Sequence, residues 1–104
     1  MYKLVFFVPQ SHLDSVKSAL FARGAGADGD YSHACWQVEG EMQYLPTQHT
    51  NPRNGKPGEI AQEKSVRVEM VCQSEILSLV IAELIKSHPD EKPAYEIYRL
   101  ERGL

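Results

Sequence analysis

Two prolines near the carboxyl end do most to limit how this chain can fold. Pro89 cannot continue a helix and keeps the residue before it out of the helical region, so the apolar helix that precedes it must end there. Pro93 then presets an extended backbone for the segment that follows. We therefore predict a short, stiff elbow at residues 87–93. It places the titratable side chains of His88, Asp90 and Glu91 beside a sheet edge.

The apolar pattern on either side of the elbow predicts the order strand, helix, strand, strand, helix, strand. The expected bounds are 4–8, 11–23, 31–45, 65–72, 74–87 and 94–100. Ser11 and Ser74 are predicted to cap the two helices, and the segment Gly24-Ala25-Gly26 to stop the first one. Gly40 predicts a bulge or bend in the second strand.

This order is typical of an α+β, ferredoxin-like βαββαβ sandwich, in which two helices cover one face of a four-stranded antiparallel sheet. Residues 1–104 are predicted to form one such domain, with the first and third strands in the centre. The first strand is apolar on both sides, and the last presents Tyr95 and Tyr98 on opposite faces. The uncovered face needs a partner, so we predict a homo-oligomer that packs sheet against sheet.

Charge and hydropathy exclude several classes of partner. The net charge is −3 and the basic residues are scattered, which argues against a nucleic-acid partner. No apolar run approaches the roughly 20 residues that span a bilayer, and the start of the chain does not have the pattern of a signal peptide. Two cysteines are too few for a disulfide scaffold. We expect a cytoplasmic protein with no membrane partner.

Several short motifs come in an order seen in one family: residues 3–9 followed by His12, Gly24-Ala25-Gly26, Gly29 with Tyr31-Ser32-His33, Arg67-Val68-Glu69, and His88-Pro89 with Glu91 and Pro93-Ala94-Tyr95. Over nearly its whole length the chain resembles the small PII/CutA-like domain inserted in bacterial members of the Ngg-one-interacting-factor (Nif-three-like, YqfO) family, here standing alone. The resemblance implies a ferredoxin-like domain that forms a trimer. The dinuclear-metal catalytic halves of that family have no counterpart in this sequence, so we expect no enzymatic activity.

The elbow is also the first candidate for a metal site. His88 and Glu91, with Asp90 and His12, offer the imidazole and carboxylate ligands that suit zinc or copper. The alternative is that His88 caps the negative end of the helix while Glu91 pairs with a nearby basic residue.

A second candidate metal site is the pair His33 and Cys35. Two residues apart on a strand, their side chains would point to the same face and could bind copper. The favoured alternative is that both are half-buried, with Cys35 acting as a small hydrophobe. Cys72 is expected in the core, and Arg67 with Glu69 in an ion pair between subunits.

The loop Thr47–Glu59 is long enough to be functional, and Arg53 and Lys56 within it could meet a phosphate, although a solvated loop explains them equally well. From all of this we predict a small binding or regulatory module. It would sense a small ligand or divalent metal at subunit clefts, or bind a protein partner. The alternatives are a metal-dependent hydrolase and a passive oligomerisation domain.

Overall fold

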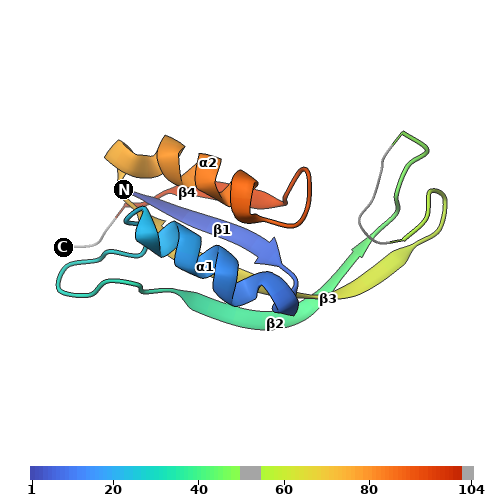
Figure 1. The fold of residues 1–104 in the computed structure, drawn as a ribbon, viewed down its shortest axis with the longest axis horizontal. Helices are drawn as coiled ribbons and strands as arrows, with labels where there is room; N and C mark the ends of the chain where they lie inside the picture. The colour runs from blue at the N-terminus through green and yellow to red at the C-terminus, as the bar shows by residue number, and fades with distance from the viewer. Residues whose placement is uncertain (50–54, 102–104) are drawn as a thin grey trace.

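The computed structural model describes residues 1–49 and 55–101 and contains one four-stranded antiparallel sheet (Figure 1). The strand order is β2-β3-β1-β4, so the first and third strands are central, as predicted. The strands are β1 (Tyr2–Val8), β2 (Trp36–Tyr44), β3 (Ala61–Cys72) and β4 (Tyr95–Arg99). The ferredoxin-like βαββαβ fold predicted from the sequence is confirmed.

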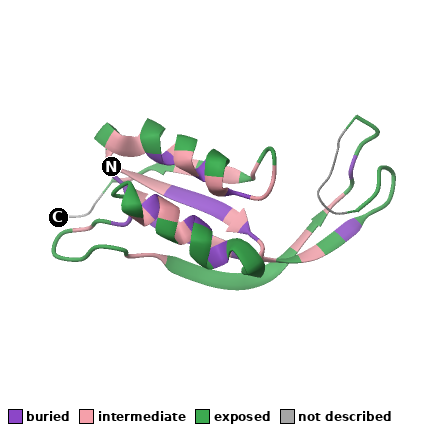
Figure 2. Ribbon diagram, viewed as in Figure 1, coloured by how far each residue is buried: buried purple, intermediate pink, exposed green. Residues whose placement is uncertain are grey.

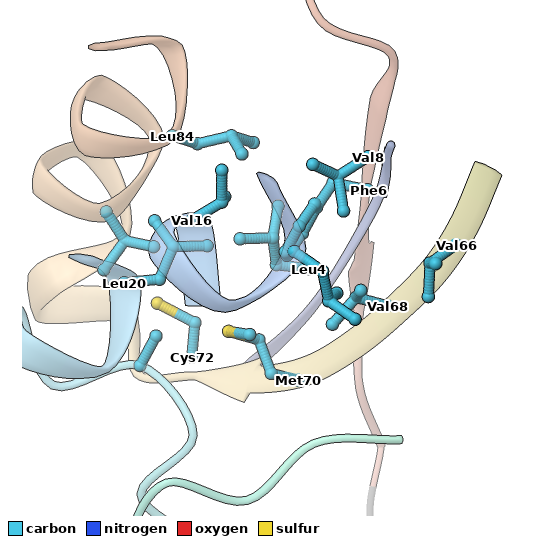
Figure 3. Close-up of a cluster of buried hydrophobic side chains, with 13 residues drawn as sticks. Leu4, Phe6, Val8, Val16, Leu20, Val66, Val68, Met70, Cys72 and Leu84 are labelled. Carbon is cyan, nitrogen blue, oxygen red and sulfur yellow. The ribbon is translucent and has the colours of Figure 1, made fainter. Parts of the chain in front are cut away.

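Two helices, α1 (Leu13–Ala22) and α2 (Leu77–Ser87), lie side by side on one face of this sheet (Figure 1). Between the helices and the sheet is one cluster of buried side chains, shown in Figure 3. It includes Leu4, Phe6 and Val8 of β1, Val66, Val68, Met70 and Cys72 of β3, Val16 and Leu20 of α1, and Val80 and Leu84 of α2. Each such side chain contributes about 1.5–3 kcal/mol when it is fully buried. No helix in the described ranges is long and apolar enough to cross a membrane.

Strands β2 and β3 form a hairpin whose far end projects beyond the helices, and we call this projecting part the arm (residues 42–49 and 55–63) (Figure 1). The pairing runs without interruption from Trp36 opposite Glu69 to Tyr44 opposite Ala61. Gly40 pairs in register with Ser65, so the strands have no bulge there, and the alternative of a bend at Gly40 stays a prediction. The arm makes the molecule elongated, with extents of 48 × 25 × 23 Å.

The second strand begins later than predicted, at Trp36 and not at residue 31. The preceding segment is held in a loop by backbone hydrogen bonds: the Gly26 amide donates to the Val71 carbonyl over 2.8 Å, and the Ala34 amide donates to the Gly26 carbonyl over 2.9 Å. His33 takes a left-handed conformation with φ of 57°, which no strand residue adopts. The prediction that His33 and Cys35 share one strand face was wrong.

The predicted helix caps were also wrong. A short 3-10 turn precedes each α-helix, η1 (Gln10–His12) before α1 and η2 (Ser74–Ile76) before α2. Neither Ser11 nor Ser74 caps a helix with its side chain. The Ser11 hydroxyl contacts His12 Nδ1 instead, and the Ser74 hydroxyl accepts a hydrogen bond from the amino terminus. The glycine stop is confirmed, since α1 ends at Ala22, just before Gly24.

The sheet face opposite the helices has no helix over it, and we call it the open face. The strand pairing places there Lys3, Val5 and Phe7 of β1, Trp36, Val38, Met42 and Tyr44 of β2, Arg67, Glu69 and Val71 of β3, and Glu96 and Tyr98 of β4. Trp36 is 56% exposed, Tyr98 45% and Val38 43%. Most of β2 is coloured as exposed in Figure 2. The predicted uncovered, partly apolar face is therefore present.

The loop after α1 allows a test with two matched glycines. Gly26 and Gly29 both have positive φ, but a Cβ on Gly26 would lie 2.8 Å from the Ala34 carbonyl oxygen, whereas one on Gly29 would contact nothing within 4 Å. We expect Gly29→Ala to cost about 1 kcal/mol for backbone strain alone. Gly26→Ala should cost about 3 kcal/mol, because a clash is added. Urea unfolding at one protein concentration measures both, and equal losses would contradict this packing.

Candidate functional site

A cleft of about 680 Å³ lies where the arm, the end of β1 and the elbow meet. The open face and the start of the arm's connecting loop supply mostly apolar lining residues, together with Glu63, Ser65 and His49. The opposite rim comes from the elbow and is charged. The lining residues are Phe7, Pro9, Met42, Tyr44, Leu45, Pro46, His49, Glu63, Ser65, Asp90, Glu91, Lys92 and Ala94. An apolar cleft with a few polar groups is the usual form of a small-ligand site.

His88 fixes the elbow at this cleft without lining it. The residue is 6% exposed, and its Nε2 lies 2.6 Å from the carbonyl oxygen of Phe7. On the other side of the ring, the Asp90 amide donates to Nδ1 over 3.0 Å. Since Nδ1 accepts, the proton belongs on Nε2, which donates to Phe7. The imidazole therefore links β1 to the elbow.

These hydrogen bonds bear on both roles predicted for His88, as a cap of the helix end and as a metal ligand. The ring does not cap the end of α2, because its hydrogen bond goes to a carbonyl of β1. Both ring nitrogens have partners within the chain, so His88 has no lone pair free for a metal unless those bonds break. The Asp90 carboxylate lies 4.0 Å from Nδ1.

The other predicted ligands lie apart from one another. His12 is exposed, with its Nδ1 3.0 Å from the Ser11 hydroxyl. His33 is exposed and lies against the Phe21 ring, with centroids 5.0 Å apart. Cys35 is half-buried against the core, and Glu91 lies at the cleft. Within residues 1–49 and 55–101, no three His, Cys, Asp or Glu side chains are grouped so that they could hold a metal ion.

Cys72 lies in the core, as predicted. Its side chain is 1% exposed, and burial raises the pKa of the thiol above its ordinary value. The sulfur therefore stays protonated, which makes it a poor nucleophile.

A charged cluster lies on the open face next to the cleft. Glu69 accepts from Lys3 Nζ at 3.2 Å and from Arg67 Nε at 3.1 Å. Burial alone would raise the pKa of Glu69, but the hydrogen bonds from Lys3 and Arg67 outweigh it and hold that pKa below its ordinary value. The Arg67 guanidinium also lies 5.7 Å from the centre of the Phe7 ring. The ion pair predicted between subunits is thus present within one chain, and a role between subunits stays a prediction.

Comparison with known proteins shows which proteins the chain resembles. A scan against models of protein families finds no match. The chain is 40% identical over 100 residues to a GTP cyclohydrolase 1 type 2 homolog of Halalkalibacterium halodurans, which covers 96% of the chain. The crystal structure of a Bacillus cereus protein related to NIF3 covers 97% of the chain at 32% identity, with a TM-score of 0.86. The chain is thus similar, over nearly its whole length, to one part of these NIF3-related proteins.

The likeness to CutA extends to the fold alone. The structure of the periplasmic divalent cation tolerance protein CutA from Archaeoglobus fulgidus covers the whole chain, with a TM-score of 0.73 but only 15% identity. The chain spans about a quarter of the length of the NIF3-related proteins, 27% of the Halalkalibacterium halodurans relative and 26% of the Bacillus cereus structure. Any activity of these relatives belongs to proteins much longer than this chain.

Sequence reasoning found the elbow but missed the apolar wall of the cleft. Met42 and Tyr44 alternate along β2 and reach the same wall as Phe7, yet only the strand pairing shows that they meet the elbow. Of the two loop residues that were predicted to meet a phosphate, Lys56 is exposed and Arg53 lies outside the described residues. His49 of the same loop lines the cleft and was not predicted.

Replacement of His88 tests its structural role. His88→Ala should cost about 3 kcal/mol of unfolding free energy, because it leaves the Phe7 carbonyl and the Asp90 amide without partners and opens a cavity. The control His12→Ala changes an exposed histidine and should stay within about 0.5 kcal/mol. Urea unfolding followed by circular dichroism measures both. A His88→Ala loss no larger than that of His12→Ala would contradict the role assigned to His88.

The Glu69 cluster predicts a pH dependence of stability. Because the folded pKa lies below the ordinary value of 4.5, ionised Glu69 stabilises the fold above that pH, and the contribution is lost as the pH falls through the folded pKa. The three side chains are 20–39% exposed, so screening limits the effect to about 1 kcal/mol or less. Wild type should exceed Glu69→Gln in urea midpoint at pH 7 and approach it at pH 3. A constant difference would contradict the shift.

Proposed function

We propose that this domain is an oligomeric small-ligand-binding module, with the cleft between arm and elbow as its binding site. The observation behind the proposal is that the cleft and the open face share a wall. Phe7, Met42 and Tyr44 belong to both. A second copy packed on the open face would therefore lie beside the cleft and limit its access to water. Assembly and binding would be coupled through these residues.

The chemistry of the open face suits burial by another copy. Trp36, Val38 and Tyr98 present apolar surface, which is unusual on a monomer when it is gathered on one face. Glu69 is already paired with Lys3 and Arg67, so burying this cluster would not leave its carboxylate without a partner. We propose three copies arranged as a ring, the assembly that the family resemblance implies.

A binding role agrees better with the site than a catalytic one. The one buried histidine beside the cleft in the described part of the chain, His88, does not line it and is held by two hydrogen bonds to the backbone. Binding of zinc or copper stays a hypothesis, and it requires ligands from more than one copy. Within the described ranges, one chain does not bring three such ligands together.

Two matched substitutions test the assembly. Val38 on the open face and Leu79 on the outer side of α2 are similarly exposed, 43% and 49%. Val38→Asp should shift the sedimenting species to a single protomer of 11.7 kDa, because a charge would be buried without a partner. Leu79→Asp should leave the assembly intact.

Far-UV circular dichroism on both variants checks that each remains folded. If the folded Val38→Asp variant sediments like wild type, or if Leu79→Asp dissociates equally, the open face is not the interface.

A further inference from the structure

We propose that a second cavity on the open face, beside the cleft, is a subsite for an apolar group of the ligand about the size of one aromatic ring. We call this cavity the hollow. The inference rests on the proposed binding function, and it adds a chemical feature of the ligand and the residues that select it. It follows from the size of the hollow, from its lining and from the wall that it shares with the cleft.

The hollow has a volume of about 240 Å³ and exists because two paired residues leave space on the open face. Gly40 of β2 has no side chain and pairs in register with Ser65 of β3, whose side chain is short. A Cβ on Gly40 would meet nothing within 4 Å. For comparison, an apolar cavity of about 150 Å³ engineered in another protein binds benzene. The hollow is therefore large enough for an aromatic ring or a branched alkyl group.

The sides of the hollow are mostly apolar. Phe7 of β1 and Val38 and Met42 of β2 line it. Arg67 lines it too, and its guanidinium lies 5.7 Å from the centre of the Phe7 ring. Glu41 also belongs to the lining, but the alternation along β2 places its side chain on the opposite face of the sheet. Because apolar surface removed from water contributes about 25 cal/mol per Å², this lining favours an apolar group.

The hollow and the cleft share a wall. Phe7, Met42 and Ser65 line both cavities, so a ligand in the cleft reaches the hollow by following this wall. The wall is held at Phe7, whose carbonyl accepts from His88 and whose amide donates to the Ala94 carbonyl over 3.3 Å. A preformed wall lowers the ordering cost of binding. The shared wall favours a ligand group, and not a side chain of another copy, as the occupant of the hollow.

Benzyl alcohol, a small probe with an aromatic ring and no charge, tests the subsite. It is titrated into the wild-type chain while the backbone amide shifts are followed by NMR. Ethanol, which has the hydroxyl without the ring, is the control. We expect benzyl alcohol to shift the amides of Gly40 and Ser65 in the hollow to saturation, and ethanol to leave them unchanged.

Filling the hollow should remove this binding. Gly40→Val should fold, because Gly40 has no positive φ, a side chain there has open space, and valine favours strands. It should raise the benzyl alcohol concentration needed for half-saturation by about tenfold or more. Ser65→Val fills the hollow from the opposite strand and should repeat the loss. Glu39→Val adds the same side chain next to Gly40 but on the opposite face of β2, and should leave binding unchanged.

The outcomes separate the subsite from the binding function. If the three valine variants bind benzyl alcohol alike, or if the probe shifts only amides of the cleft such as that of Glu91, the hollow is not a subsite, while the cleft remains a binding site. If Gly40→Val lowers the sedimenting mass and Glu39→Val does not, another copy occupies the hollow and the subsite is wrong. If benzyl alcohol shifts amides in neither cavity, the subsite fails, and the proposed binding function fails with it.

Discussion

One buried imidazole joins the parts of this domain that meet at the cleft. His88 donates a hydrogen bond to the Phe7 carbonyl on β1 and accepts one from the Asp90 amide in the elbow. These two bonds hold the end of α2, the elbow and the central strand β1 together. Pro89 makes this possible, because it forces the chain out of the helix at His88, whose φ and ψ of −76° and 143° are extended. The side of the cleft that the elbow forms is thereby positioned by the core of the fold.

The second constraint is that two helices cover only one face of the sheet. The alternating residues of β3 bury Val66, Val68 and Met70 against the helices, and the other face keeps Trp36 and Val38 exposed (Figure 2). The cleft lies at the end of that exposed face. In this account, covering the open face with further copies and forming a ligand site are two consequences of the same one-sided sheet.

The sequence predicted what depends on periodicity and on proline. The strand order, the glycine stop and the elbow follow from local rules, and Val66 to Cys72 alternate clearly enough to mark β3 as central. It did not predict what depends on contacts between distant segments. The residue pattern predicted that His33 belongs to the second strand. In the structure His33 lies in a loop, which the hydrogen bond from the Gly26 amide to the Val71 carbonyl helps to hold. His88 was predicted as a metal ligand because its actual partner, the Phe7 carbonyl, lies 81 residues away in the sequence and no local pattern reveals it.

The molar mass of the metal-stripped chain in solution, measured by light scattering during size-exclusion chromatography and repeated after adding zinc or copper, tests the account most directly. The account predicts about three times the 11.7 kDa protomer mass in both conditions, because the open face drives assembly without metal. A monomer that assembles only with metal would assign assembly to metal ligands. A monomer in both conditions would contradict the claim that the open face is buried by further copies.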